Sequence, residues 1–347
     1  MRIAYIINHL GVSGVNNVVM DLVNEMMKNN HECVVFYFKD TDNSLNYPCE
    51  TRKVESWKDK INFEGFNVVH CHGLLPMMNM MLHRYERKNV RFVVTLHCYC
   101  FEDLLDLYGI SKGTLMGLIY LFCARKFDKI VCLSKHMMAY YHKFLPFNKL
   151  SFVYNTRVLN NDVLTKTEEK DIKEFKGDCK LIGMNSVLIC RKGIDIMLGA
   201  LVKLPQEYKL CIVGDGQKKD TFMKLAHKLG IDSRVFFAGV HSNAYRYLDY
   251  YDILALPSRS EGFPLTLLEA AVKGTTVVVS DLPIVKECFT NGKDVIVFRL
   301  ADGNDGLAEA ILKTGSKPSL GSSLHQLYLK NFAPRVFYEG YMKVYEE

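Results

Sequence analysis

Short apolar runs alternate with segments of helical periodicity along almost the whole chain. Runs of this length are typical of buried strands, and their alternation with helices predicts parallel sheets joined by crossover helices. Six runs lie in the first half of the sequence and six in the second. They cover residues 3–7, 33–38, 68–70, 92–96, 130–133 and 152–154, then 180–183, 209–213, 235–238, 253–256, 277–279 and 295–298. The sequence therefore predicts an α/β protein with two parallel sheets.

A charged stretch from residue 160 to residue 180 separates the two halves. It is poor in large apolar residues, as domain borders usually are. A chain of 347 residues also exceeds the usual size of a single core. We expect one domain over residues 1–158 and a second domain over residues 159–328.

Composition narrows the cellular setting. No apolar run approaches the length of a membrane span, and residues 1–8 resemble a strand and not a signal peptide, so we expect a cytosolic protein. The eleven cysteines lack the spacing of a disulfide framework and are expected to be reduced thiols. A net charge of +6 falls short of the basic stripe that a nucleic-acid binder carries, so no nucleic-acid partner is expected.

Basic residues gather near aromatic residues in one part of the first domain. The bases are Arg125, Lys126, Lys129, Lys135, Lys143 and Lys149, and the aromatic residues are Tyr140, Tyr141 and Phe144. This pattern suits peripheral contact with an anionic membrane surface, which for a cytosolic protein is the inner face of the membrane. An ordinary solvated helix face is the alternative.

The segment that follows the predicted strand at residues 253–256 carries two carboxylates eight positions apart. Pro264 suits the first position of a helix, so Glu261 is expected in the loop and Glu269 about one turn inside the helix. The free N–H groups of Leu265 and Thr266 would then favour anionic oxygens such as those of a diphosphate. An anion seat flanked by two acids suits a sugar nucleotide. A capped surface helix with solvated acids is the alternative.

Two glycine-bearing turns follow predicted strands, one at residues 11–14 and one at residues 214–216. A glycine turn before a helix lets a ligand approach the backbone closely. Neither turn has the full spacing of a dinucleotide fingerprint, which disfavours a nicotinamide enzyme. A plain tight turn remains an equal alternative for both.

Candidate metal ligands are few. Asp40, Thr41 and Asp42 match a DxD pattern, but neighbouring Asn43 and Ser44 favour a turn there. The histidines and cysteines at residues 70–72 and 97–100 lack zinc spacing, so reduced core cysteines are the better interpretation. We expect no metal and no cofactor.

Taken in order, several motifs resemble those of the retaining nucleotide-sugar glycosyltransferases of family four, also called glycosyl transferases group 1. The motifs are the glycine turn after the first strand, NVVHCHG at 67–73, VVTLH at 93–97, VYN at 153–155, KG at 192–193, IVGDG at 212–216 and SRSEGFPLTLLEA at 258–270. The resemblance implies the GT-B fold, in which two Rossmann-like domains with parallel sheets face a central cleft. It makes residues 1–158 the acceptor side, residues 159–328 the donor side and residues 329–347 a closing helix that returns to the first domain.

The resemblance also implies roles for individual residues. His97, Lys192 and Glu261 would be catalytic, with His97 and Glu261 on the donor sugar and Lys192 on the diphosphate. The donor-binding residues would be Gly14, Arg191, Lys192, Glu261, Gly262, Phe263, Leu265, Thr266 and Glu269. Glu269 would bind the ribose hydroxyls, and the amides of Leu265 and Thr266 would receive the diphosphate. A histidine satisfied at a strand end is the alternative for His97, and a solvated surface lysine is the alternative for Lys192.

The chain departs from the family pattern at one position that concerns the diphosphate. Ser186 and Val187 stand where members usually carry an Arg that also grips the diphosphate. Arg191 is a candidate substitute, although neighbouring side chains seldom point the same way. The acid that often follows the histidine of VVTLH is also replaced, by Cys98.

The function that the resemblance implies is retaining transfer of a hexose-type sugar without a metal. The donor would be a UDP- or GDP-sugar, and the acceptor a glycan or lipid-linked glycan in surface or capsular polysaccharide synthesis. Two alternatives stay open: a sugar-nucleotide epimerase of the same fold, and a non-catalytic accessory subunit that binds a sugar nucleotide. The segment from Glu261 to Glu269 argues against the epimerase, and the missing Arg motivates the accessory subunit.

Overall fold

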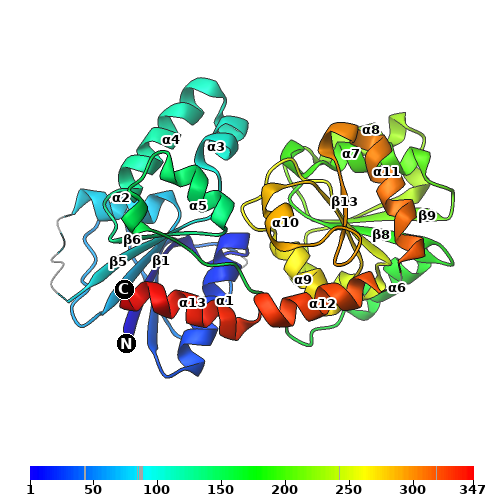
Figure 1. Ribbon diagram of the computed structural model, residues 1–347. Coiled ribbons are helices and arrows are strands. Elements are labelled where there is room, and N and C mark those ends of the chain that lie inside the picture. The colour runs from blue at the N-terminus through cyan, green and yellow to red at the C-terminus, as the bar shows by residue number, and fades with distance from the viewer. Residues whose placement is uncertain (43, 84, 86–88, 242, 318) are drawn as a thin grey trace. The chain divides into compact units, whose positions relative to one another are not determined.

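The computed structural model describes residues 1–42, 44–83, 85, 89–241, 243–317 and 319–347. The chain divides into two compact units (Figure 1). Unit 1 comprises Met1–Arg157 and Phe332–Glu347, and unit 2 comprises Val158–Asn331. The predicted borders after residues 158 and 328 lie close to these positions. The acceptor role of the first domain, the donor role of the second and the cleft stay predictions.

Unit 1 is built on a parallel sheet with seven strands in its described part, in the order β3-β2-β1-β4-β5-β6-β7. The strands are β1 (Arg2–His9), β2 (Glu32–Lys39), β3 (Glu50–Lys53), β4 (Val68–His72), β5 (Arg91–Leu96), β6 (Lys129–Cys132) and β7 (Leu150–Phe152). The central strands β1 and β4 are almost wholly buried, which explains their continuous apolar sequence. The chain order reverses between them, and ligands of such sheets bind beyond the carboxyl ends of the strands at that reversal.

Helices connect these strands and cover the sheet. They are α1 (Gly14–Lys28), α2 (Leu74–Leu82), α3 (Cys100–Tyr108), α4 (Ile110–Ala124), α5 (Lys135–His142) and the C-terminal α13 (Pro334–Glu346). Helix α13 belongs to unit 1, as the predicted return of the last helix requires. Its buried Tyr341 bonds Thr95 Oγ1 at 3.0 Å, and its buried Tyr345 bonds His70 Nδ1 at 2.8 Å. These contacts fasten the end of the chain to strands β4 and β5.

Unit 2 repeats the plan with a parallel sheet of six strands in its described part, in the order β10-β9-β8-β11-β12-β13. The strands are β8 (Lys180–Asn185), β9 (Tyr208–Val213), β10 (Val235–Gly239), β11 (Ile253–Leu256), β12 (Val277–Ser280) and β13 (Ile296–Phe298). The helices are α6 (Lys166–Lys176), α7 (Ile194–Lys203), α8 (Lys219–Lys228), α9 (Leu265–Lys273), α10 (Pro283–Cys288), α11 (Gly303–Lys313) and α12 (Leu320–Asn331). Here the chain order reverses between β8 and β11. The expected α/β class with two parallel sheets is confirmed.

The sequence prediction differs from the structure at two strands. Strand β3 was not predicted, because its residues ETRK are mostly exposed at the edge of the sheet and carry no apolar run. The run at residues 152–154 is displaced from the observed strand, which is β7 (Leu150–Phe152). Tyr154 instead packs its ring against Phe332, at a centroid distance of 5.7 Å.

One of the three aromatic residues in the basic segment of unit 1 is not on the surface. Tyr141 is fully buried, where its hydroxyl donates to Cys98 O at 2.6 Å and accepts from Cys100 N at 3.1 Å. Tyr140 and Phe144 are half-buried. The predicted membrane contact therefore cannot use Tyr141. None of the helices in the described ranges has the length and apolarity that a bilayer crossing requires.

Candidate active site

The segment predicted to hold an anion lies beyond the carboxyl end of β11, in unit 2. The chain leaves β11 at Leu256 and enters α9 at Leu265, with Pro264 as the N-cap. No side chain caps this helix, and helix geometry leaves the N–H groups of Leu265 and Thr266 without partners inside the helix. The predicted helix is confirmed, although Pro264 stands one position before its first residue.

Lys192 lies beyond the carboxyl end of β8, the strand beside β11. It ends the short 3-10 helix Cys190–Lys192, and Gly193 follows in the left-handed conformation with φ of 69°. A Cβ atom at Gly193 would lie 2.0 Å from the carbonyl oxygen of Pro257, so only glycine fits between the two loops. The KG pair thus brings Lys192 against the loop that carries Glu261.

The side chains of Lys192, Glu261 and Ser258 meet at this point. Lys192 Nζ lies 2.5 Å from Glu261 Oε1, and Ser258 Oγ donates to the same oxygen at 2.8 Å. Burial acts to raise the pKa of Glu261. The charges of Lys192 and Arg191, with the hydrogen bonds from Lys192 and Ser258, outweigh burial and hold that pKa below its ordinary value. Glu261 is therefore a carboxylate paired with an ammonium group.

Arg191 also faces this carboxylate, despite its position next to Lys192. Its guanidinium donates to Ser260 O at 3.2 Å, and its charge helps to lower the pKa of Glu261. Arg259 has a different role, because it forms a bidentate ion pair with Asp195 at 2.7 and 3.0 Å. The structure thus places two cations, Lys192 and Arg191, near Glu261.

A small cavity of about 10 Å³, room for about one water, lies among these groups. It is lined by Met184, Asn185, Ser186, Lys192, Ala255, Leu256, Ser258, Glu261 and Thr266. Thr266 Oγ1 donates to Asn185 O at 3.3 Å. The buried Oγ of Ser186 has no hydrogen-bond partner among the described residues, which marks a polar position that a ligand or water can satisfy.

Four further predicted donor residues lie on the same segment as Glu261 but do not line this cavity. Gly262 and Phe263 are buried in the loop before α9, and Leu265 is half-buried at the first turn of the helix. Glu269 is buried one turn further along α9. The structure thus brings Lys192, Glu261 and Thr266 together at one point and holds Glu269 on the adjoining helix.

The second glycine turn, at residues 214–216, has a packing role. Gly214 has φ of 142°, and a Cβ atom there would lie 2.0 Å from Ser186 O. Leu188 N donates to Asp215 O at 2.9 Å, so the turn after β9 supports the loop that leads to Lys192. These contacts give the turn a packing role, and its alternative role as a ligand loop stays a prediction.

In unit 1, Gly14 begins α1 directly after its N-cap Ser13, whose hydroxyl accepts from Asn16 N at 3.2 Å. The buried Asn16 side chain donates to His9 O at 2.7 Å and to Gly11 O at 2.6 Å. These bonds fix the loop between β1 and α1, at the strand reversal of unit 1. The predicted place of Gly14 at a helix N-terminus is confirmed, and its contact with a donor stays a prediction.

His97 follows β5 and bonds a second histidine, His72, at the end of β4. His97 Nε2 and His72 Nδ1 lie 2.9 Å apart. Burial lowers the pKa of His97 to about 4, and burial together with the nearby His70 and His97 lowers the pKa of His72 well below its ordinary value. Both rings are therefore neutral near pH 7, so one nitrogen of the pair donates and the other accepts. His72 Nε2 is buried without a partner in the described part of the chain.

The metal candidates have other partners. Lys53 Nζ pairs with Asp40 Oδ2 at 2.5 Å, and Ser44 Oγ donates to Thr41 O at 3.0 Å, which is the expected turn. Asn43 lies outside the described residues. His70 bonds Tyr345 and Thr95 through its two ring nitrogens. No group of three or more possible metal ligands occurs within the described ranges.

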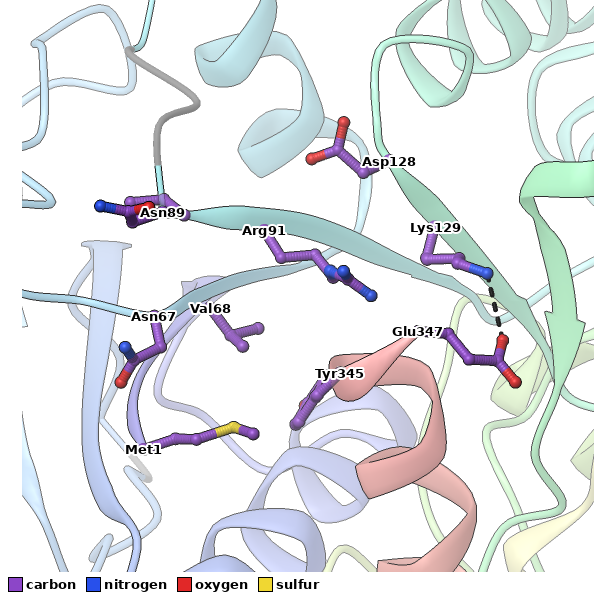
Figure 2. Close-up of a pocket in the computed structure, with 10 residues that line it drawn as sticks. Met1, Asn67, Val68, Asn89, Arg91, Asp128, Lys129, Tyr345 and Glu347 are labelled. Carbon is purple, nitrogen blue, oxygen red and sulfur yellow. Dashed lines mark hydrogen bonds and ion pairs between the residues drawn. The ribbon is translucent and has the colours of Figure 1, made fainter.

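A larger hollow in unit 1 lies at the opposite edge of the sheet. Figure 2 shows this cavity of about 580 Å³, lined by Arg91, Asp128, Lys129, Tyr345 and Glu347 among others. Val68, Arg91 and Lys129 begin strands β4, β5 and β6, so this cavity is at the amino ends of the strands. Ligands of open parallel sheets bind at the carboxyl ends, where His72 and His97 lie. The hollow is therefore not the candidate active site.

Sequence reasoning missed three residues that contact the predicted ones, two in unit 2 and one in unit 1. Ser258 bonds Glu261, Ser186 presents its hydroxyl to the cavity, and His72 bonds His97. His72 is part of the motif NVVHCHG and follows the predicted strand at residues 68–70, which is the one signal that could have found it. Ser186 and Ser258 carry no such signal, since serine is common in loops.

Comparison with known proteins identifies the family. Residues 165–326 match the family model of Glycosyl transferases group 1, and residues 12–157 match that of Glycosyltransferase Family 4. The chain is 31% identical over 296 residues to the O-antigen biosynthesis glycosyltransferase WclY of Escherichia coli. The aligned residues cover 83% of this chain and 82% of WclY. The chain belongs to the group 1 glycosyltransferases. The lipopolysaccharide core biosynthesis glycosyltransferase LpsE of Rhizobium meliloti is another relative of this group 1 glycosyltransferase, 28% identical over 44% of this chain and 46% of LpsE.

Solved structures show that this group 1 glycosyltransferase has the predicted GT-B fold. HepE of Anabaena, in complex with UDP and glucose, superposes with a TM-score of 0.78 over 100% of this chain and 99% of HepE, at 15% identity. Sucrose-phosphate synthase from Thermosynechococcus elongatus superposes with a TM-score of 0.81 over 99% of this chain and 98% of the synthase, at 16% identity. Such low identity establishes the fold and nothing more specific.

Proposed function

We propose that this chain transfers a hexose-type sugar from a UDP- or GDP-sugar to a glycan or lipid-linked acceptor in surface or capsular polysaccharide synthesis. The relatives WclY and LpsE, named for O-antigen and lipopolysaccharide core biosynthesis, support the pathway class. HepE is known in complexes with UDP and with UDP-glucose, which supports a nucleotide-sugar donor.

The observation that carries this function is that Lys192 and Thr266, at the N-terminus of α9, line one cavity beyond the strand reversal of unit 2, with Arg191 near Glu261. Breakage of the bond between the anomeric carbon and the phosphate oxygen leaves negative charge on the diphosphate. Fixed cations and helix N–H groups stabilise such charge where it forms. They supply this stabilisation without a metal, so we propose a metal-independent enzyme.

Lys192 is paired with Glu261 in this structure. A bound diphosphate would replace Glu261 as the partner of the Lys192 ammonium group. The carboxylate of Glu261 would then accept a hydrogen bond from a sugar hydroxyl. Arg191 would pair with the second negative charge of the diphosphate. It would thereby take the role of the family Arg that Ser186 and Val187 replace. We propose that the amides of Leu265 and Thr266 also receive the diphosphate.

Glu269 is the proposed ligand of the ribose hydroxyls, since a carboxylate can accept two hydrogen bonds at once. For unit 1, we propose that His97 contacts the donor sugar and that the backbone of Gly14 borders the diphosphate. We further propose retention of anomeric configuration. The acceptor oxygen would form its bond on the face that the phosphate leaves, and its proton would pass to the leaving phosphate, so no protein nucleophile is required.

Incubation of the purified chain with a panel of UDP- and GDP-sugars tests this function, with EDTA present and no acceptor added. We expect slow release of free nucleoside diphosphate from one donor, and faster release when the acceptor glycan is supplied. Interconversion of the sugars would instead establish an epimerase. Binding of a sugar nucleotide without turnover under both conditions would establish an accessory subunit.

A further inference from the structure

Strand β1 of unit 1 ends in a histidine, His9, to which the proposed function gives no role. The strand lies beside β4, at the strand reversal of this sheet, and His9 is its last residue. Ligands of open parallel sheets bind beyond this edge at such a reversal. The residue is half-buried, so it is not part of the packed core. His9 therefore stands where a side chain that binds a substrate is expected.

One ring nitrogen of His9 is occupied by the backbone of the turn that follows β1. Gly11 N donates to His9 Nδ1 at 3.0 Å. Asn16 Nδ2, which is also a donor, lies 3.4 Å from the same ring nitrogen. A nitrogen that accepts a hydrogen bond carries no proton, so the proton of this ring is on Nε2. His9 thus presents an N–H donor at its second nitrogen.

The turn that holds the ring of His9 is braced by further contacts. The buried side chain of Asn16 donates to His9 O at 2.7 Å and to Gly11 O at 2.6 Å. The hydroxyl of Tyr47 donates to Asn16 O at 3.1 Å. A Cβ atom at Gly11 would lie 2.9 Å from Thr41 Oγ1 and 3.1 Å from His9 Nδ1, so a larger residue would disturb the bond that fixes the ring. The tautomer and the orientation of His9 are therefore set by the protein before a ligand binds.

The second nitrogen, His9 Nε2, makes no hydrogen bond within the described part of the chain. A fixed group that only donates is best matched by a partner that only accepts. The oxygens of an ionised diphosphate only accept hydrogen bonds, whereas a sugar hydroxyl both donates and accepts. Gly14, whose backbone is proposed to border the diphosphate, closes the same turn where α1 begins. Both observations favour a phosphate oxygen as the partner of His9.

We propose that His9 Nε2–H donates a hydrogen bond to the terminal phosphate of the donor, which is the phosphate that carries the sugar. This inference rests on the proposed function. His9 would then be a catalytic residue, because negative charge develops on this phosphate as its bond to the sugar breaks. The ring keeps its proton throughout, so His9 acts as a fixed donor and not as an acid or a base.

Two variants separate the roles of the two ring nitrogens. In His9→Asn the amide oxygen can replace Nδ1 as the acceptor of Gly11 N, but no donor remains at the position of Nε2. In His9→Gln the longer amide can place a donor at that position, but the acceptor for Gly11 N is lost. We expect His9→Asn to weaken the binding of UDP or GDP about tenfold, the scale for one hydrogen bond to a charged group, and His9→Gln to weaken it less. Turnover of the donor without acceptor should fall at least as much in His9→Asn.

Nucleoside monophosphates provide the contrast, because UMP and GMP lack the terminal phosphate. Calorimetry should find their affinity for His9→Asn unchanged. His142→Asn is the matched control, since His142 is exposed at the end of α5 in the same unit. This control should bind all four nucleotides as the unchanged chain does. Unchanged affinity of His9→Asn for UDP and GDP, an equal loss for UMP and GMP, or a larger loss in His9→Gln than in His9→Asn would overturn the inference.

The ¹⁵N chemical shifts of the His9 ring in the ligand-free chain test the fixed tautomer without any nucleotide. We expect the proton on Nε2, and a proton on Nδ1 would overturn the inference whichever nucleotide binds. If the unchanged chain bound neither UDP nor GDP, the proposed function would fail together with this inference. Normal nucleotide binding by the unchanged chain, with no loss in His9→Asn, would overturn this inference alone.

Discussion

Replacement of Glu261 by Gln separates two roles that the structure gives to one carboxylate. Glu261 pairs with Lys192 at 2.5 Å and accepts from Ser258 at 2.8 Å. The side chains of Glu261 and Lys192 are only 11% and 20% exposed, so solvent screens their charges weakly. Glutamine has the same shape and keeps an oxygen that accepts both hydrogen bonds. The substitution therefore removes a negative charge with little change in geometry.

We expect Glu261→Gln to bind free nucleoside diphosphate more tightly. In the unchanged protein a diphosphate oxygen must share Lys192 with the carboxylate. At a separation of about 6 Å and an effective dielectric constant of about 20 to 40, two negative unit charges repel each other by about 1.4 to 2.8 kcal/mol. Removal of one charge should therefore tighten binding about ten- to a hundredfold. Turnover should fall by about the same factor, since a charged hydrogen bond to the sugar contributes about 1.5 to 3 kcal/mol.

Isothermal titration calorimetry with UDP and GDP, together with the rate of donor turnover, measures both effects. Glu169→Gln is the matched control, because Glu169 pairs with Lys173 at 2.6 Å on the exposed surface of α6. This control should change neither the affinity nor the turnover. Weaker binding of free nucleoside diphosphate by Glu261→Gln would show that the carboxylate does not compete with the ligand for Lys192, and would refute the reasoning.

Three further predictions concern the two cations beside Glu261 and the buried histidines of unit 1. Lys192→Ala should lower turnover by about 10²-fold or more, which is the scale for loss of a fixed charge-stabilising group. Arg191→Ala should lower turnover nearly as much. A small effect of Arg191→Ala on turnover would show that Arg191 does not replace the missing Arg. The free energy of unfolding should fall as the pH drops from about 6.5 toward about 4, because the buried histidines of unit 1 bind protons only when unfolded. A melting temperature that stays constant over this pH range would contradict the conclusion that these buried rings are neutral. His72→Leu should change the tautomer of His97, which NMR would detect as altered ¹⁵N chemical shifts of the His97 imidazole. His72→Asn should preserve this tautomer. Unchanged ¹⁵N shifts in both variants would mean that His72 does not position His97.

Apolar periodicity identified most of the fold. The buried runs correspond to β1, β2, β4, β5 and β6 in unit 1 and to β8 through β13 in unit 2. Strand β3 was not predicted, because an exposed edge strand needs no apolar residues. The register of β7 was displaced because both Leu150 and the aromatic residues after it are apolar, and tertiary packing decides which of them pair.

The candidate site was only partly predictable. The helix N-terminus at Leu265 follows from Pro264 and the strand before it, which are local features of the sequence. The meeting of Lys192 and Glu261 depends on the pairing of β8 with β11 and on the close approach at Gly193. The contact between His72 and His97 likewise depends on the pairing of β4 with β5. Without the family resemblance, sequence spacing could not have joined residues that lie so far apart along the chain.

Hydrogen exchange of the intact chain with and without UDP or GDP, in the presence of EDTA, tests the proposed diphosphate seat most directly. The amides of Leu265 and Thr266 should exchange more slowly when the nucleotide is bound, because they would donate to the diphosphate. Protection should extend to the loop around Arg191 and Lys192, whereas the amino ends of β4, β5 and β6 at the hollow of Figure 2 should exchange unchanged. Protection at the hollow, with none at the start of α9, would contradict the proposed site.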